Sequence, residues 1–499
     1  MLRNLSILLL IVLILGSCSS ASTPEAERES LISLKFEQKL SSTYDEVIAN
    51  YRKLDEAWPE AKLLEAGPTD CGKPLHLFVM SANRQFDPER IRKSGKTIVM
   101  IMNGIHPGEP DGMEASILVA DDILRNHNGM RKLLDDAVVC IIPVYSIGGL
   151  LYQDRWHRTN QPEPLNPGYR GNAKNLDLNR DFVKLDTENA KSFVRLFRQW
   201  DPDVFLDTHA TNGSDHQHVV TYLPAQHNSM PEPVGRFFKE TMIPAIYGKM
   251  AATPYPMIPY AEYTNQSPEE GIESYVQTPR FSTGYTLLFH SLTQMIENLC
   301  YQPYVERVWG SYHFINSMIG FANEHSGQIR QVREEAKLAA KTKKEFALSY
   351  TIDSSRFETI EFRGFERGTD ISPLTGEVRP IYDYSKPFTT SPAAAGTVRP
   401  PSGGIPSGYQ GPGENLAGAH AQNPCGGRCE RTDPRQGHPR FFRGRFGKPG
   451  ERGGPSRCQA RQRAGGHAGL RRLQGQSLYG PGAQVESDQG RGPQSDGLP

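Results

Sequence analysis

The sequence predicts an α/β fold, with a mixed, mostly parallel central sheet flanked by helices. Four short apolar runs carry this prediction, because nearly continuous apolar runs are typical of strands buried on both faces of a sheet. They cover residues 75–80, 97–102, 137–143 and 203–207. Helical patterns lie between them, and strands alternating with helices indicate a sheet covered by helices.

The predicted helices follow from apolar residues spaced three and four apart. Residues 114–125 place Ile117, Leu118, Ala120 and Ile123 on one face, and residues 187–200 and 305–321 show the same kind of pattern. Two segments follow. Residues 326–346 are heavily charged and are expected to form a solvated helix. Residues 350–384 contain short strand patterns and are expected to begin a small β-rich appendage.

The overall charge balance hides two unlike parts of the chain. The 499 residues carry 56 Lys and Arg against 56 Asp and Glu, and the mean hydropathy of −0.53 excludes a polytopic membrane protein. Residues 391–499 hold 14 Arg and one Lys against seven acidic residues, a net charge of +8, so residues 1–390 carry −8. Balanced charge gives no reason to expect nucleic acid as a partner.

The tail at residues 391–499 is predicted to be disordered, because it holds 24 of the 47 Gly and 13 of the 38 Pro and shows no periodicity. Three interpretations compete. It is an Arg–Gly segment that binds anions, a metal site built from Cys425, Cys429, His438 and Cys458, or a frameshifted reading of an ordered domain. The abrupt replacement of Lys by Arg after Phe388 favours the frameshift, and the Cys/His spacing matches no common zinc module.

The first residues are typical of a signal peptide. One Arg precedes an apolar run at residues 7–15, which is too short to span a membrane. The sequence Leu15-Gly-Ser-Cys18 resembles the lipoprotein box of bacteria, in which the Cys is lipidated. Cys18 is therefore the expected lipidation site, and a lipid anchor would hold the protein in the cell envelope, facing the periplasm or the cell surface. The alternative is an ordinary secretory signal with a stray Cys.

The predicted parts of the chain are a signal peptide (1–17), an N-terminal arm (18–60), a main globular domain (61–325), a charged helix with the start of the appendage (326–390) and the tail (391–499).

Two predicted strands end in metal-ligand residue types. Asn103-Gly-Ile-His106-Pro-Gly-Glu109 follows the strand at residues 97–102, and Asp207-Thr-His209 follows an apolar Val-Phe-Leu. Chemistry in open α/β sheets gathers at the carboxyl ends of strands. Two His and one Glu form a catalytic zinc set with one open position, although a His-x-x-Glu alone is a weak signal.

Two further motifs turn this pattern into a family resemblance. Asn175-Leu-Asp-Leu-Asn-Arg-Asp-Phe182 and Gln294-Met-Ile-Glu297-Asn-Leu299 complete four separated elements in one order. Together they resemble the zinc carboxypeptidase (carboxypeptidase A-like) family over about residues 65–325. The resemblance makes the main globular domain a catalytic domain and implies the family's fold.

The resemblance also implies a role for each matching residue. His106, Glu109 and His209 would hold one Zn²⁺ per chain, and Asp177 would orient the first His from behind. Glu297 would act as general base toward zinc-activated water. Asn179 and Arg180 would hold the terminal carboxylate of a peptide substrate. These residue types suit the roles, since a carboxylate behind a ligating His fixes its tautomer and a guanidinium binds a carboxylate through two parallel bonds.

Two positions of the family pattern have two candidates each. The Arg that stabilises the oxyanion matches Arg158 in Trp156-His-Arg158, although His157 intrudes, and Arg170 is the second candidate, nearer to Asn179. Arg158 is the preferred catalytic residue, with Arg170 assigned to substrate binding. Tyr285 is the expected substrate-binding Tyr, and Tyr275 is the other candidate.

The predicted activity is hydrolysis of the C-terminal peptide bond of peptides. A zinc-dependent N-acyl amino acid deacylase of the aspartoacylase type is the alternative, because such enzymes contain a motif that resembles residues 177–180. They typically have Gly-Asn-Glu after the His, where this chain has Pro-Gly-Glu. A third possibility is an inactive peptide-binding lipoprotein, against which the intact ligand set and Glu297 argue.

Overall fold

The computed structural model describes residues 29–399 except 212–215, 261, 264–270, 274–275, 346, 348–349, 353–357 and 396–397. The predicted signal peptide, Cys18 and the tail from residue 400 onward lie outside the described residues. Within the described ranges, no helix is long and apolar enough to cross a membrane.

An eight-stranded mixed sheet forms the centre of the fold, in the order β1-β2-β4-β3-β5-β10-β6-β7. Its central strands β4, β3, β5 and β10 run parallel, while β1 and β2 at one side and β6 at the other are antiparallel to their inner neighbours. The predicted mixed, mostly parallel sheet is confirmed. The strands are β1 (Ala61–Pro68), β2 (Pro74–Met80), β3 (Thr97–Met102), β4 (Ala137–Ile142), β5 (Val204–Ala210), β6 (Val220–Pro224), β7 (Ile258–Pro259) and β10 (Leu292–Asn298).

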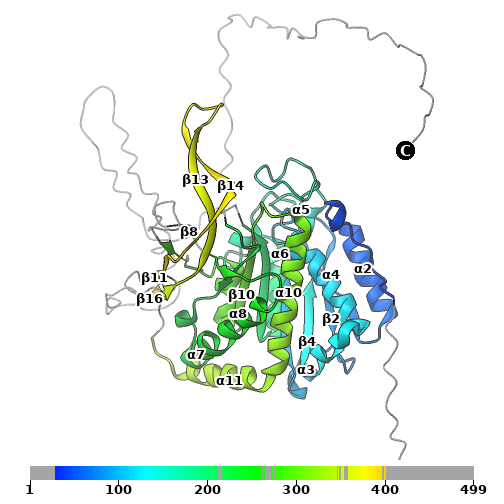
Figure 1. The fold of residues 1–499 in the computed structure, drawn as a ribbon. Coiled ribbons are helices and arrows are strands. Elements are labelled where there is room, and N and C mark those ends of the chain that lie inside the picture. Colours follow the sequence, from blue (N-terminus) through cyan, green and yellow to red (C-terminus); the bar gives the residue numbers. More distant parts are fainter. Residues whose placement is uncertain are drawn as a thin grey trace, which may run out of the picture. The chain divides into compact units, whose positions relative to one another are not determined.

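Helices cover both faces of this sheet because its central strands are apolar on both sides. In β3, Val99 and Ile101 belong to one hydrophobic cluster, whereas Met100 belongs to the other. Helices α2 (Tyr44–Ala57), α4 (Asp111–Leu124) and α10 (Tyr304–Glu324) pack on the first face, and α6 (Glu188–Trp200) packs on the second (Figure 1). The remaining helices are α3 (Pro88–Ser94), α5 (Ile147–Leu150), α7 (Glu232–Phe237), α8 (Ile243–Ala251), α9 (Ser282–Thr286) and α11 (Ser326–Thr342).

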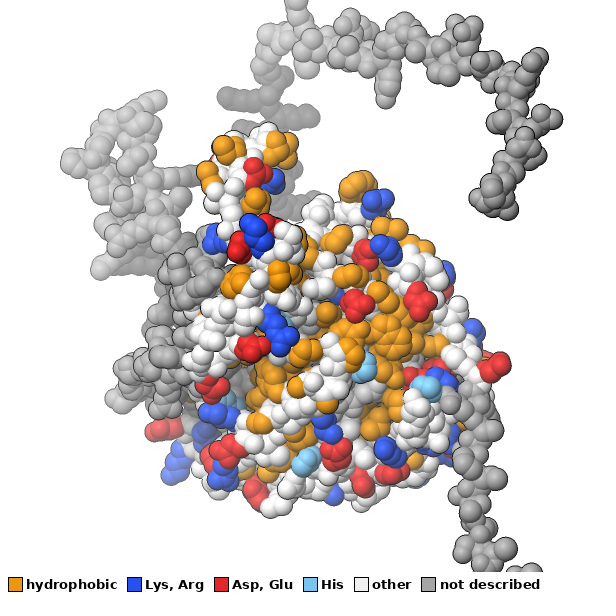
Figure 2. Space-filling model, in the orientation of Figure 1, with side chains coloured by type: hydrophobic (Ala, Val, Ile, Leu, Met, Phe, Trp, Pro, Cys, Tyr) orange, Lys and Arg blue, Asp and Glu red, His pale blue; other side chains and the backbone are white. Residues whose placement is uncertain are grey.

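Polar side chains define where two of these helices begin. The Thr43 side chain accepts a hydrogen bond from the Glu46 N–H, and the Glu46 carboxylate accepts one from the Thr43 N–H, which is a capping box at the start of α2. Thr187 caps α6 by accepting from the Ala190 N–H at 3.0 Å. Figure 2 shows the face that carries α10, with hydrophobic side chains gathered over its middle and charges of both signs around them.

The expected charged helix, α11, is less solvated than predicted. Ile329 and Ala336 are fully buried, and the side chain of Arg333 is only 3% exposed. Arg333 forms ion pairs with Asp201, at 2.8 Å, and with Asp203. The charged helix α11 is therefore attached to the segment that leads into β5.

The segment predicted to begin a β-rich appendage contains a long hairpin, and two small sheets combine its other strands with strands from elsewhere in the chain. The hairpin joins β13 (Phe362–Ile371) to β14 (Val378–Thr390). The small sheets contain β8 (Glu262–Tyr263), β9 (Ile272–Glu273), β11 (Thr351–Ile352), β12 (Glu358–Thr359), β15 (Ala393–Ala395) and β16 (Val398–Arg399). The Gln217 N–H donates to the Arg363 carbonyl at 2.9 Å, and Phe362 packs against Ile258 and Ile272. Figure 2 shows hydrophobic side chains exposed on the hairpin, where Leu374 is 94% exposed.

Candidate active site

A tight turn after β3 carries the first two predicted metal ligands. Gly104 adopts a φ of +64°, a conformation that favours Gly, and the Glu109 N–H donates to the His106 carbonyl at 2.9 Å. A Cβ on Gly108 would lie 2.8 Å from the Gly168 carbonyl oxygen, so the loop that contains Gly168 approaches this turn closely. The turn points His106 and Glu109 toward the carboxyl end of the neighbouring strand.

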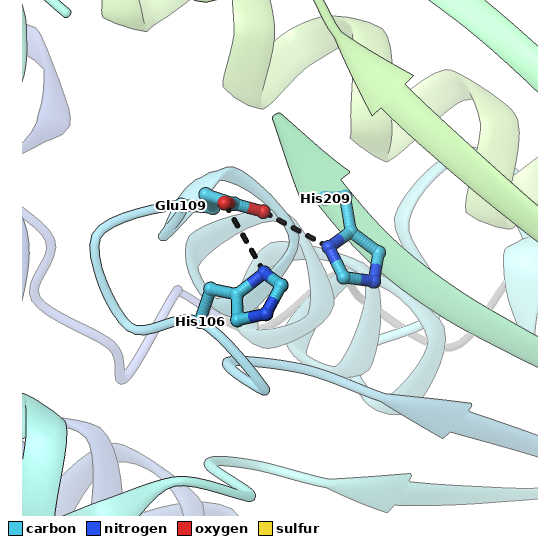
Figure 3. Close-up of side chains that lie close together, drawn as sticks. All are labelled: His106, Glu109 and His209. Carbon is cyan, nitrogen blue, oxygen red and sulfur yellow. Dashed lines mark hydrogen bonds and ion pairs between the residues drawn. The ribbon is translucent and has the colours of Figure 1, made fainter. Parts of the chain in front are cut away.

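The third ligand, His209, comes from the end of β5. Met102 on β3 pairs with Asp207 on β5 in parallel register, which aligns the two strand ends. His106, Glu109 and His209 consequently meet, with one ligand atom of each within 4.8 Å of the others (Figure 3). Among the described residues, this is the one group of three such side chains that could hold a metal ion.

The Glu109 carboxylate lies between the two imidazole rings. Its Oε1 is 3.2 Å from Nδ1 of His106, and its Oε2 is 2.9 Å from Nδ1 of His209 (Figure 3). All three side chains are at most 4% exposed. Nδ1 of His106 is buried and has no hydrogen-bond partner among the described residues. Two convergent imidazole nitrogens and one carboxylate are the donor set that catalytic zinc prefers, so these residues fit a zinc ion.

Each candidate ligand has a charged partner on its outer side. Nε2 of His106 lies 3.0 Å from Oδ1 of Asp177, as predicted. Nε2 of His209 lies 2.9 Å from Oδ2 of Asp207, and Arg158 donates to Oε1 of Glu109 at 2.9 Å. Outer partners of this kind fix the tautomer and orientation of metal ligands.

These partners also determine the charge states. Burial would raise the pKa of Glu109, but His106 and Arg158 outweigh it and hold that pKa well below the ordinary value. Burial opposes protonation of His209, yet the carboxylates of Asp207 and Glu109 raise its pKa well above the ordinary value. For Asp177, burial is again outweighed, and His106 with Arg170 lowers the pKa. The carboxylates of Glu109 and Asp177 are therefore ionised and can support a cation.

Glu297 lies beside the triad on β10, a strand whose parallel register pairs it with His209 on β5. Burial and the Glu109 carboxylate raise the pKa of Glu297 to about 7, although His209 and His106 oppose the shift. Its side chain lines the same cavity as the three candidate ligands.

The cavity has a volume of about 280 Å³ and contains most of the predicted site. Its lining residues are His106, Glu109, Arg170, Asn179, Arg180, His209, Ala210, Tyr260, Phe281 and Glu297. Asn179 and Arg180 belong to a 3₁₀ turn, Leu178–Arg180, which begins directly after Asp177. The Arg180 guanidinium lies 4.5 Å from the centre of the Phe281 ring, and Oδ1 of Asn179 accepts from the Ser282 N–H at 2.9 Å.

The two Arg candidates occupy different places. Arg170 lines the cavity, is 39% exposed, and donates to Oδ2 of Asp177 at 3.0 Å. Arg158 is 7% exposed, bonds to Glu109 and is not a lining residue. The preference for Arg158 as the oxyanion residue stays a prediction, and Arg170 is the one that faces the cavity.

Tyr285 lies in an aromatic cluster and not on the cavity lining. Its ring centre is 5.7 Å from that of Phe182 and 5.3 Å from that of Phe289. Its substrate-binding role stays a prediction, and the other candidate, Tyr275, lies outside the described residues. The Tyr that lines the cavity is Tyr260.

Sequence reasoning assigned no role to Asp207, Tyr260, Phe281 and Ser282. Asp207 was visible in the Asp-Thr-His of the second strand end, and a carboxylate two residues before a ligand His was an available signal. Tyr260 and Phe281 stand in loops without a motif, so nothing in the sequence distinguishes them.

Comparison with known proteins agrees with this geometry. The family model described as zinc carboxypeptidase (Peptidase_M14) matches residues 47–337. Carboxypeptidase 2 of Trichophyton rubrum and that of Trichophyton tonsurans are each 27% identical over 116 residues, which is 23% of this chain and 19% of the relative. The chain thus spans about a fifth of the length of these curated relatives.

Solved structures of metallo-carboxypeptidases are also similar. The enzyme from Burkholderia cenocepacia is 17% identical with a TM-score of 0.42, covering 57% of this chain and 69% of that one. The enzyme from Pseudomonas aeruginosa, solved in complex with (2-guanidinoethylmercapto)succinic acid, is 14% identical with a TM-score of 0.43, covering 58% and 70%. Since the family model matches more than half of the chain, this protein belongs to the zinc carboxypeptidase family.

Proposed function

We propose that this chain is a zinc-dependent metallocarboxypeptidase that hydrolyses the C-terminal peptide bond of peptides. The observation that carries the proposal is one cavity lined by the metal triad, by Glu297 and by the Asn179–Arg180 pair. Zinc held by His106, Glu109 and His209 supplies a Lewis acid for the scissile carbonyl and lowers the pKa of water toward neutrality.

Arg180 and Asn179 orient the substrate in this proposal. The planar guanidinium binds the terminal carboxylate through two parallel hydrogen bonds, and the Asn179 amide adds a neutral donor. Stacking on Phe281 holds the guanidinium in one plane. Recognition of a free carboxylate in the cavity that the triad also lines would select the last peptide bond of the chain.

Glu297 moves the proton. Its carboxylate accepts a proton from the attacking water and returns it to the nitrogen of the leaving amino acid. Arg170 faces the same cavity and stabilises negative charge that develops on the scissile carbonyl oxygen. Arg158 keeps Glu109 ionised and oriented from behind, through its 2.9 Å hydrogen bond.

The test is hydrolysis of a panel of peptides and N-acyl amino acids, with zinc content measured on the same samples. Glu297→Gln is expected to lower kcat by at least about 100-fold and to keep one zinc per chain, because the amide cannot take a proton. Glu324→Gln, which changes an exposed carboxylate on α10, is the control.

Three outcomes would change the conclusion. Unaltered activity of Glu297→Gln would refute the proposed base. Release of acyl groups only, with intact peptides, would make the chain a deacylase of the aspartoacylase type, since N-acyl amino acids present the same carboxylate next to an amide. Zinc binding without any hydrolysis would leave a peptide-binding lipoprotein.

We further propose that Cys18 is lipidated and anchors the enzyme in the cell envelope. The support is the Leu-Gly-Ser-Cys sequence after a short apolar run. Metabolic labelling with a fatty acid analogue is expected to mark the wild type and not Cys18→Ser. Labelling of both would remove the assignment.

A further inference from the structure

The His209 ligand has an outer carboxylate that the sequence motifs do not assign. Asp207 is fully buried, and its Oδ2 lies 2.9 Å from Nε2 of His209. This contact is an ion pair and not an aligned hydrogen bond: neither Nε2 of His209 nor Oδ1 of Asp207 has a hydrogen-bond partner among the described residues. A buried carboxylate is costly unless it has a charged or hydrogen-bonding partner, and the imidazole of His209 is the charged partner available to Asp207.

A short loop segment holds this carboxylate from the other side. The Ser282 hydroxyl donates to Oδ2 of Asp207, the same oxygen that faces His209. The Ser282 N–H donates to Oδ1 of Asn179 at 2.9 Å. Ser282 is fully buried at the start of α9, next to the Phe281 ring that stacks on Arg180. One residue therefore contacts both the metal side and the carboxylate-binding side of the cavity.

We infer that Asp207 and Ser282 are positioning residues for His209: the Ser282 hydroxyl fixes the Asp207 carboxylate, and the carboxylate orients the imidazole with Nδ1 toward the metal site. The inference rests on the zinc site of the proposed function. Asp207 lies beside Nε2 of His209 as Asp177 lies beside Nε2 of His106, through an ion pair in the first case and a hydrogen bond in the second. In both cases the carboxylate leaves Nδ1 free to bind metal.

The arrangement also links two functions of the cavity. Ser282 reaches Asp207 through its side chain and Asn179 through its backbone, so the two links respond differently to mutation. Ser282→Ala removes the hydroxyl and keeps the N–H that orients Asn179. The variant therefore isolates the metal side of the link.

The experiment measures zinc affinity by competition with a chromophoric chelator for the wild type, Asp207→Asn, Ser282→Ala and the double variant. Asp207→Asn is expected to weaken zinc binding about 10- to 100-fold, as loss of an outer partner does at other sites. Ser282→Ala is expected to weaken it by up to about tenfold, and the double variant should match Asp207→Asn alone, because Ser282 acts through Asp207.

The matched control is Ser291→Ala. Ser291 is also fully buried and its hydroxyl donates to a backbone carbonyl, that of Pro202, at 2.7 Å. It precedes β10 at the end opposite to Glu297, so its loss should destabilise the fold without changing zinc affinity. If Asp207→Asn does not fold without zinc, as judged by thermal unfolding of the apoprotein, the comparison of Ser282→Ala with Ser291→Ala decides.

Several results would overturn the inference. The first is a zinc affinity of Asp207→Asn equal to that of the wild type. The second is a loss of zinc affinity in the double variant that equals the product of the two single losses. The third is an equal zinc affinity of Ser282→Ala and Ser291→Ala. Peptide hydrolysis tells this failure apart from failure of the proposed function. If the wild type binds zinc and cleaves no peptide, only the proposed function is overturned. If the enzyme is active, the KM of Ser282→Ala for peptides should equal that of the wild type. A wild type without zinc overturns both.

Discussion

In the proposed function, Arg180 is the residue that selects which end of a peptide enters the cavity. Its guanidinium combines a charge with a fixed plane, which stacks on Phe281. Lys carries the same charge without the planar fork, so substitution by Lys removes the geometry and keeps the charge.

Arg180→Lys is therefore expected to raise KM for peptides about 10- to 100-fold, which corresponds to the loss of a charge-assisted hydrogen bond. Steady-state kinetics on one peptide measures this. Arg280→Lys is the matched control, because Arg280 lies over the same Phe281 ring at 5.1 Å but is exposed and does not line the cavity. Equal KM values in both variants would contradict the role of Arg180.

Substitutions of Arg170 and Arg158, the two Arg residues near Glu109, are expected to have different effects. Arg170→Met is expected to lower kcat about 100-fold and to leave zinc content intact, as loss of an oxyanion donor does. Arg158→Met removes the buried cation that bonds to Glu109 and should reduce zinc affinity instead. Zinc content and kcat, measured together, test both. Full zinc binding with a collapsed kcat in Arg158→Met would restore Arg158 as the oxyanion residue.

Motifs predict residues well where the backbone dictates their position. His106, Glu109 and His209 follow directly from strand ends in register, and Asp177 follows from its place before the Asn-Arg pair. Tyr260 reaches the cavity from a loop whose path depends on tertiary packing, and no local pattern encodes that path. The same holds for the choice between Arg158 and Arg170, which share one long connection.

At the scale of elements, α4 connects the metal-binding turn to the N-terminal segment. Glu114 lies in the first turn of α4 and is fully buried. The Ser42 N–H donates to Oε1 of Glu114 at 2.6 Å, and the Ser42 hydroxyl donates to Oε2 at 3.0 Å. Burial outweighs these bonds and raises the pKa of Glu114 to about 7.

This shift predicts a pH dependence of stability. The folded protein keeps the Glu114 proton above the ordinary pKa of 4.5, so the contribution is complete below pH 4.5 and is lost as pH rises to about 7. Glu114→Gln lacks this titration. The difference in free energy of unfolding between variant and wild type should change by up to about 3 kcal/mol across that window, in favour of the variant at high pH. Urea unfolding of the apoproteins at three pH values measures it, and parallel stability curves would refute it.

Apolar runs predict the central strands but not β10. Residues 97–102 coincide with β3, since every side chain there is apolar or buried. In β10 the buried positions include Gln294 and Asn298, which have specific partners: Gln294 accepts from the Tyr222 hydroxyl at 2.7 Å, and Asn298 donates to Asp111 at 3.1 Å. Because β10 contains buried polar residues, it shows no continuous apolar run. The partners of these polar residues are distant in sequence, so the sequence does not indicate that they are buried.

At the scale of the whole molecule, metal binding should stabilise the fold, because the proposed zinc site exists in the folded arrangement of the triad and not in the separated segments. Removal of zinc with a chelator is expected to lower Tm, and a zinc concentration 1,000 times Kd would add about 4 kcal/mol. Thermal unfolding with and without chelator measures the shift. His106→Ala should show a much smaller one, and equal shifts in both proteins would place the bound metal elsewhere.

The charge difference along the chain gives a prediction for the gene. The net charge changes from −8 in residues 1–390 to +8 in residues 391–499, and at the same point Arg replaces Lys as the main basic residue. We expect that sequencing across codons 385–395 reveals a frameshift and that another frame encodes a periodic, ordered sequence. If sequencing confirms the present reading frame and no other frame encodes an ordered sequence, the Arg–Gly segment is part of the protein.

The register of β10 has a consequence for how the enzyme matures. β10 is the last strand of the sheet to be synthesised, yet it inserts between β5 and β6 and brings Glu297 beside His209. A chain still emerging from a ribosome or a translocation channel can gather the three ligands before it contains its proton acceptor. If Glu297 acts as the proposed base, incomplete chains should therefore bind metal without hydrolysing peptides.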